Sequence, residues 1–90
     1  MKSWNIEEFL RECEELSKNQ YTYDYSRMPD GICNGHKVMA YDKLWTSVVI
    51  DGCICDLGVI NEKYPNGSNT YQVGDKTMTA LEYVRYKLEQ

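Results

Sequence analysis

Short turn-forming pairs that contain glycine divide the middle of this chain into brief segments. The sharpest are Asn34–Gly35 and Asp51–Gly52, and each lies between stretches rich in apolar residues. Asn-Gly and Asp-Gly tolerate the positive φ angles that a two-residue hairpin turn requires. The pattern therefore predicts an antiparallel β-meander of about five strands. We expect its strands at residues 21–27, 36–41, 44–50, 53–60 and 70–73, with a short addition at 76–78.

Capping motifs predict one helix before the meander and one after it. Asn5 and Glu8 have the spacing of a capping box, and apolar residues then recur at intervals of three and four through residues 6–18. Thr79 and Glu82 repeat the motif ahead of a second amphipathic stretch. The expected fold is thus α+β, with an antiparallel meander flanked by an N-terminal and a C-terminal helix.

The length and the charge of the chain narrow the classes of function. Ninety residues provide for one hydrophobic core, so we expect a single domain over residues 1–90. A net charge of -4 argues against binding to the phosphate backbone of nucleic acid, which needs a surplus of lysine and arginine. No apolar run approaches the roughly 18 residues of a membrane span, so we expect no membrane association and a cytoplasmic protein. Because the cytoplasm is a reducing compartment, we expect the four cysteines to be free thiols.

Two cysteines one residue apart follow the second turn. If Asp51–Gly52 forms a type I′ turn, Cys53 lies opposite Ile50 and Cys55 lies opposite Val48. All four side chains then share one face of the hairpin, because side chains alternate along a strand. Free cysteine behaves as a small hydrophobic residue, so this face predicts two buried thiols.

A zinc site is an alternative interpretation of the same residues. Cys33 and His36 flank the Asn-Gly turn, and with Cys53 and Cys55 they could supply the ligands of a Cys3His centre. Same-face neighbours on a regular strand lie about 7 Å apart, whereas two thiolates on one zinc must approach to about 4 Å. Only a bulge or a bent strand would close that gap. We therefore expect no cofactor and retain a zinc-stapled domain as an alternative.

Cysteine–histidine catalysis would have to use His36, the single histidine of the chain. Cys33 is a candidate nucleophile, with Asp42 or Asp51 as the carboxylate that orients the imidazole. No spacing in the sequence brings these residues together, and Asp30 would raise the pKa of a neighbouring Cys33 thiol. The glycines form no nucleotide-binding motif. We therefore expect a non-enzymatic protein.

Aromatic and acidic residues are the strongest candidates for a binding surface. Tyr21, Tyr23 and Tyr25 alternate along one predicted strand and so share a face. Tyrosine is enriched at protein interfaces, and a row of rings also suits the stacking of a nucleotide base. The acidic face of the first helix would suit a basic partner. The predicted interaction residues are Tyr21, Tyr23, Tyr25, Trp45, Glu8, Glu12 and Glu15.

Apolar residues occur on both faces of the predicted hairpin, which leads us to expect a homodimer. Four apolar residues lie opposite the buried face, whereas a sheet with one solvated face would be polar there: Trp45, Val49, Ile54 and Ile60. We expect a small acidic intracellular module that binds or inhibits a protein with a basic or aromatic-accepting surface. Its size and lack of catalytic motifs also fit a phage or mobile-element inhibitor of host defence. The alternatives are a small-ligand or nucleotide-sequestering domain and the zinc-stapled domain.

Overall fold

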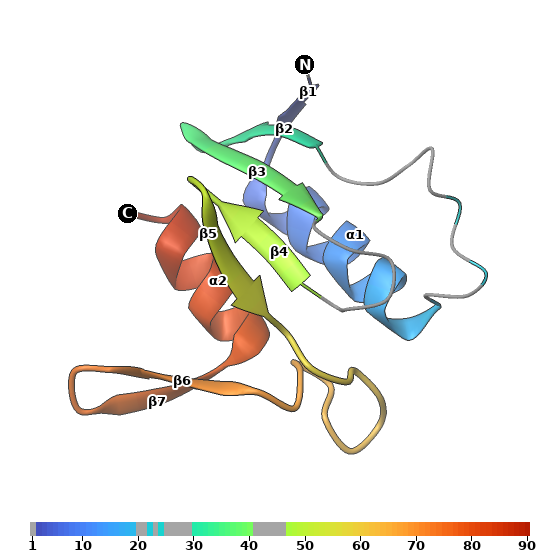
Figure 1. Ribbon diagram of the computed structural model, residues 1–90, viewed down its shortest axis with the longest axis vertical. Coiled ribbons are helices and arrows are strands. Elements are labelled where there is room, and N and C mark those ends of the chain that lie inside the picture. The colour runs from blue at the N-terminus through green and yellow to red at the C-terminus, as the bar shows by residue number, and fades with distance from the viewer. Residues whose placement is uncertain (1, 20–21, 23, 25–29, 41–46) are drawn as a thin grey trace.

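The computed structural model describes residues 2–19, 22, 24, 30–40 and 47–90, and Figure 1 labels its elements. The predicted α+β class is confirmed, with a helix toward each end and a mostly antiparallel sheet. No helix in the described ranges is long and apolar enough to cross a membrane. In chain order the elements are β1 (Lys2–Trp4), α1 (Ile6–Lys18), β2 (Asp30–Cys33), β3 (His36–Ala40), β4 (Ser47–Ile50), β5 (Cys53–Asp56), β6 (Thr70–Val73), β7 (Lys76–Thr79) and α2 (Ala80–Leu88).

The central sheet has the strand order β1-β2-β3-β4-β5. From β2 to β5 each strand pairs antiparallel with the next. The strands predicted at 36–41, 44–50 and 53–60 are confirmed as β3, β4 and β5 within the described residues, whereas β2 lies at 30–33, where no strand was expected. Asn34–Gly35 joins β2 to β3 and Asp51–Gly52 joins β4 to β5, and all four turn residues have φ angles between 50° and 87°. Cys53 lies opposite Ile50 and Cys55 opposite Val48, as the turn geometry predicted.

The pairing differs from the prediction at the edges. β1 pairs parallel with β2, which makes the sheet mixed, and β6 and β7 form a separate two-stranded hairpin. β5 ends at Asp56 rather than at residue 60, because the Asp56 carboxylate accepts the amide of Gly58, whose φ is 74°. The strand predicted at 21–27 lies mostly outside the described residues. Thr22, which is described, lies in a turn after α1.

Gly31 allows β1 to lie against β2. It pairs with Lys2 and has a φ of 146°, which residues with side chains rarely adopt. A Cβ atom at this position would lie 2.0 Å from the Lys2 carbonyl oxygen, far inside van der Waals contact. An Asp-Gly pair is typical of a turn, but here the glycine serves the close approach of two backbones.

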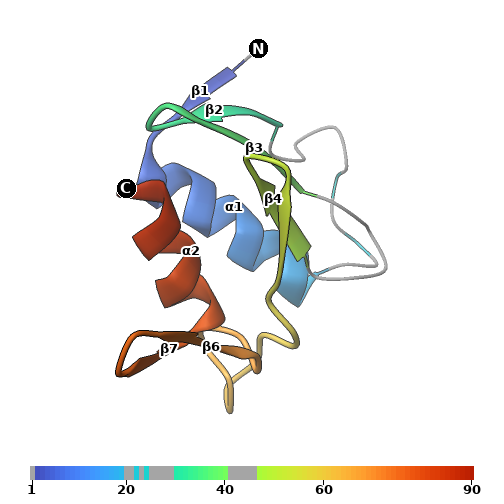
Figure 2. The ribbon, with the colours of Figure 1, turned by 60° about the vertical axis from the view of Figure 1, so that its left-hand side comes forward.

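Both helices pack on the same face of the central sheet, as the views in Figures 1 and 2 show. α1 and α2 contact each other, and α2 also contacts β5, β6 and β7. One hydrophobic core therefore fills the space between the helices and the inner face of the sheet. Its largest fully buried side chains are Phe9, Ile50, Leu57, Leu88, Val38, Val48 and Val84.

The predicted capping residues occupy the starts of both helices. The Asn5 side chain accepts the amide of Glu8 at 2.7 Å, so α1 begins where the sequence indicated. At the start of α2, the Glu82 carboxylate accepts the Thr79 amide at 3.0 Å and the Thr79 hydroxyl at 2.6 Å. These bonds hold the pKa of the Glu82 carboxyl below its ordinary value, and they fix the point at which β7 becomes α2.

Polar side-chain contacts join α2 to α1 and to the central sheet. Arg85 forms an ion pair with Glu7 of α1, with 2.7 Å between Nη1 and Oε1. Asn34, in the turn between β2 and β3, donates from Nδ2 to the Leu88 carbonyl oxygen at 2.7 Å. This bond satisfies a carbonyl in the last turn of α2, which has no partner within the helix. The turn at one end of the sheet therefore supports the end of the helix beneath it.

Gly31→Ala is expected to lower the free energy of unfolding by about 2 to 4 kcal/mol, because the new methyl group must displace β1 or distort β2. Gly74→Ala is the matched control. Gly74 also has a positive φ, 61°, but no atom lies within 4 Å of the added Cβ. Only backbone strain of about 1 kcal/mol remains there. Denaturant unfolding measures both losses, and equal losses would show that the close approach of β1 contributes nothing.

Candidate protein-binding surface

The face of the central sheet opposite the helices carries a row of apolar side chains. Met39, Val49 and Ile54 lie side by side on β3, β4 and β5, because Met39 pairs with Val49 and Val49 pairs with Ile54. Ile32 of β2 lies on the same face, opposite Lys37 of β3. We call Ile32, Met39, Val49 and Ile54 the outer face.

Two residues of the outer face are large exposed hydrophobic residues. Met39 is 41% exposed and Ile54 is 55% exposed, whereas the residues that alternate with them face the core. The prediction that Val49 and Ile54 lie opposite the buried face is confirmed. Ile60, which was expected beside them, is buried instead, because the chain has left the strand at Asp56.

Three tyrosines form a stacked cluster, the tyrosine cluster, beside the open edge of β5. Tyr71 of β6 stacks on Tyr83 of α2 with 4.4 Å between ring centroids, and Tyr83 lies 6.4 Å from Tyr86. The Tyr71 hydroxyl donates to the carbonyl oxygen of Asp56 at 2.6 Å. Burial raises the pKa of the Tyr71 phenol, so the hydroxyl keeps its proton. The helical spacing of Tyr83 and Tyr86 is visible in the sequence, but their contact with β6 is not.

The predicted interaction residues are only partly covered by the structure. Tyr21, Tyr23, Tyr25 and Trp45 lie outside the described residues, so a tyrosine wall or a stacked nucleotide stays a prediction. The acidic residues Glu8, Glu12 and Glu15 lie on α1 and are partly or fully exposed. Glu8 lies 3.9 Å from the amino group of Lys2, a weak surface ion pair. None of the three belongs to the outer face, because α1 covers the opposite side of the sheet.

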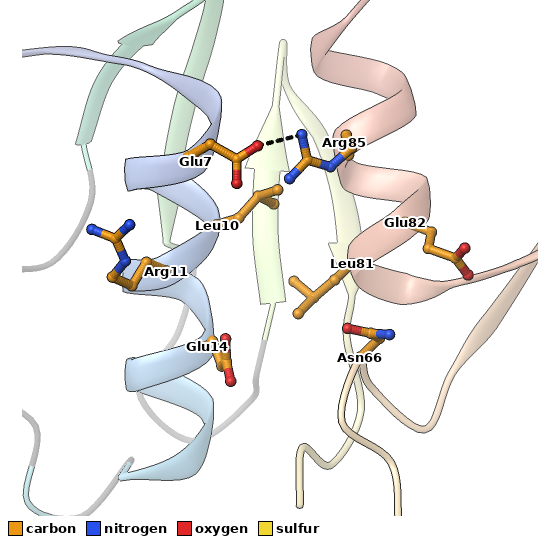
Figure 3. Close-up of a pocket in the computed structure, with 8 residues that line it drawn as sticks. All are labelled: Glu7, Leu10, Arg11, Glu14, Asn66, Leu81, Glu82 and Arg85. Carbon is orange, nitrogen blue, oxygen red and sulfur yellow. Dashed lines mark ion pairs between the residues drawn. The ribbon is translucent and has the colours of Figure 1, made fainter.

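A groove of about 270 Å³ runs between α1 and α2 (Figure 3). Leu10 and Leu81 point toward each other between the helices, and the ion pair of Glu7 with Arg85 spans the groove. The Arg85 guanidinium holds the pKa of the Glu7 carboxyl below its ordinary value. At the other end, the backbone carbonyl of Asn66 accepts the Leu81 amide at 3.0 Å. These groups hold the two helices together, and this structural role accounts for the groove.

The four cysteines lie in different environments. Cys13, Cys33 and Cys55 are buried, and burial raises the pKa of each thiol. Cys53 is exposed because it lies next to the turn at the start of the edge strand. The prediction of two buried thiols is therefore right for Cys55 and wrong for Cys53. Among the described residues, which include Cys33, His36, Cys53 and Cys55, no group of three potential ligands lies close enough to hold a metal ion.

One pair considered for catalysis does form. His36 Nδ1 lies 2.5 Å from Asp51 Oδ2, and the other carboxylate oxygen accepts the Lys37 amide at 3.0 Å. The hydrogen bond with His36 is the main reason why the pKa of the Asp51 carboxyl is lowered. The candidate nucleophile Cys33 is 0% exposed, and Asp42 lies outside the described residues. The pair instead fastens the β4–β5 turn to the start of β3.

Comparisons with known proteins give no relative from which a function could be inferred. No protein-family model, no curated protein and no solved structure matches the chain. The function is therefore argued from the outer face, the edge of β5 and the tyrosine cluster themselves.

Cys53 is expected to react with Ellman's reagent in the folded protein, while the other three thiols react only on unfolding. Burial keeps those three thiols protonated and out of reach of the reagent. Cys53→Ser is expected to remove the fast reaction, which would assign that reaction to the Cys53 thiol. A zinc centre that used Cys33, Cys53 and Cys55 would instead block the fast reaction until a chelator was added. A fast phase that appears only with chelator would therefore contradict the environments described above.

The contribution of Asp51 to stability is expected to disappear in acid. Because its pKa is lowered in the folded protein, the carboxylate stabilises the fold above its unfolded pKa of about 3.9. That stabilisation is lost as the pH falls through the lower folded pKa. Asp51→Asn should therefore be less stable than the wild type near about pH 6, and the difference should shrink toward about pH 2.

Chemical denaturation of both proteins across this pH range measures the difference. Glu7 and Glu82, whose pKa values are also lowered, are present in both proteins, so their effects cancel in the comparison. A difference that stays constant with pH would show that the charge of Asp51 does not contribute.

Proposed function

We propose that this protein is a non-enzymatic module that binds another protein through the outer face of its sheet. The observation that carries the proposal is that both helices cover the inner face, while Met39 and Ile54 remain largely exposed on the other. A contiguous row of apolar side chains is unfavourable in water and is typical of a surface that a partner covers. A sheet with one solvated face would normally be polar there.

The surroundings of the outer face also suit a protein partner. Asp30, Lys37 and Asp56 are exposed and border the apolar row on the same side of the sheet. An apolar centre with a polar rim is the usual anatomy of a protein interface. Met39 adds an unbranched, adaptable side chain that can follow the shape of a partner. The negative charge of the chain opposes binding to nucleic acid phosphates, which leaves protein as the favoured partner.

Two forms of such binding were expected from the sequence and remain part of this proposal. A module that covers a partner's active or binding surface inhibits that partner, and inhibition of a host defence protein would be one such case. A second copy of the chain is a partner of the same kind, and the predicted homodimer would bring two outer faces together. Neither form requires a catalytic group, in keeping with the buried position of Cys33.

Met39→Lys is expected to weaken binding to the partner at least about thirtyfold, because it places a charged group that must be desolvated at the centre of an apolar contact. Thr77→Lys is the matched control, since Thr77 is exposed on β7, outside the central sheet. Affinity capture from cells that produce the protein, with the wild type and both variants, identifies the partner. The affinity of each variant is then measured with the purified partner.

A protein retained by the wild type and by Thr77→Lys, but lost with Met39→Lys, would support the proposal. The melting temperatures of all three proteins should be similar, because both replaced residues are exposed in the free protein. If Met39→Lys retains its partners with unchanged affinity, the outer face is not the binding surface.

A further inference from the structure

We infer that β5 binds an extended segment of a partner protein, which adds to the central sheet as a sixth strand and lies over α2. The inference rests on the proposed function and specifies how the partner is recognised. Three features of the described structure carry it: the backbone groups of Ile54, the position of α2 and the tyrosine cluster.

The open edge of β5 presents backbone hydrogen-bonding groups at Ile54. The two-residue turn makes Ile50 and Cys53 a hydrogen-bonded pair, because both turn residues have the positive φ angles of a type I′ turn. In an antiparallel ladder, hydrogen-bonded and non-hydrogen-bonded pairs alternate. The N–H and C=O groups of Ile54 and Asp56 therefore point away from β4, toward the open side of the sheet.

The bonds made by Asp56 confirm this direction. Its carbonyl oxygen accepts the Tyr71 hydroxyl at 2.6 Å and the Asn69 side-chain amide at 3.0 Å, and neither residue belongs to the central sheet. Among the described residues, no such bond reaches the N–H or C=O group of Ile54. β5 also lacks the lysine or proline that commonly protects an edge strand from further pairing.

α2 lies on the inner side of the sheet next to this edge. Figures 1 and 2 show α2 behind the inner face of the sheet and reaching past β5 on its open side. Tyr83, Tyr86 and Lys87 are half-buried on this helix, and Tyr83 stacks on Tyr71, whose hydroxyl reaches β5. A sixth strand would thus find backbone partners at its side and aromatic rings beneath it.

The geometry specifies the chemistry of the bound segment. In an antiparallel pair, the residue opposite Ile54 exchanges two backbone hydrogen bonds with it, and its side chain extends the outer face. The residues on either side of it point toward α2, beside Cys53 and Cys55, where Tyr71 and the Tyr83 ring stacked on it offer apolar contact. The segment is therefore extended, free of proline at these positions, and apolar or aromatic at three consecutive residues.

The position of α2 argues against a second copy of this chain at the β5 edge. Antiparallel pairing of β5 with its symmetry mate would place both sheets in one plane, with both α2 helices on the same side. Figure 1 shows α2 reaching past β5 on its open side, so each copy would bring a helix to the side where the other copy's helix already lies. The occupant is therefore a strand that has no helix beneath it, from a different protein. Homodimer formation through the outer face would leave this edge available.

Ile54→Pro tests the inference, because it removes the outward N–H while leaving the ladder between β4 and β5 intact. Ile54→Thr is the matched control, since it changes the side chain but keeps the N–H. The probe is a phage-displayed library of random nine-residue peptides, selected on the folded wild-type protein. The affinity of synthetic copies of the selected peptides is then measured by fluorescence anisotropy for the wild type and both variants.

We expect selected peptides to carry three consecutive apolar or aromatic residues and to bind Ile54→Pro about tenfold or more weakly than the wild type. Ile54→Thr should bind the peptides within about threefold of the wild-type affinity, because the backbone hydrogen bonds are kept. Hydrogen exchange gives a second measurement that needs no variant: the Ile54 amide should exchange rapidly in the free protein and become protected with peptide bound. If no peptide is selected, or if binding leaves this amide unprotected, the inference is wrong.

Met39→Lys separates this inference from the proposed function. Met39 lies on β3, two strands away from β5, so the selected peptides should bind this variant within about threefold of the wild type. If the natural partner is lost with Met39→Lys but unaffected by Ile54→Pro, the outer face binds the partner and the strand-addition inference fails. If the peptides bind at the β5 edge and the affinity for the natural partner is unchanged by Met39→Lys, the strand-addition inference is supported and the outer-face proposal fails.

Discussion

Both helices of this protein cover the same side of a five-stranded sheet, and the rest of the structure depends on that arrangement. The ion pair of Glu7 with Arg85 joins α1 to α2, and Leu10 and Leu81 line the groove between the two helices. One face of the sheet is therefore sealed by a continuous core, whereas Met39 and Ile54 on the other face are exposed. Among the described residues, both helices lie on the first face and none lies on the second.

The parts of the fold that were predictable are those set by local chemistry. A two-residue turn with positive φ angles fixes the pairing of the strands on both sides of it, so the register of β4 with β5 follows from Asp51 and Gly52 alone. The starts of the helices depend on side chains within one turn, which is why Asn5 and Thr79 mark them correctly. In each case the deciding interaction joins residues only a few positions apart.

The parts that were not predictable depend on contacts between distant residues. The pairing of β1 with β2 requires Gly31 to meet Lys2, and nothing near either residue in the sequence indicates this. Alternation places Cys53 and Cys55 on one face but does not reveal that the core ends between them. The same holds for the binding surface. Val49 and Ile54 were expected to lie opposite the buried face, whereas the neighbouring position of Met39 follows only from the register of β3 with β4.

The parallel strand β1 closes one edge of the sheet with little backbone pairing. It has three residues and a single neighbour, and its partner β2 lies on the far side of α1 in the chain. Closing so long a loop costs conformational entropy that three residues of pairing offset only partly. β1 therefore depends on its side chains as well: Trp4 belongs to the hydrophobic core, and its indole N–H donates to the Asp30 carbonyl oxygen at 3.3 Å. Loss of this strand would make β2 the edge of the sheet in place of β1, and would free the backbone groups of residues 31–33 that now pair with residues 2–4.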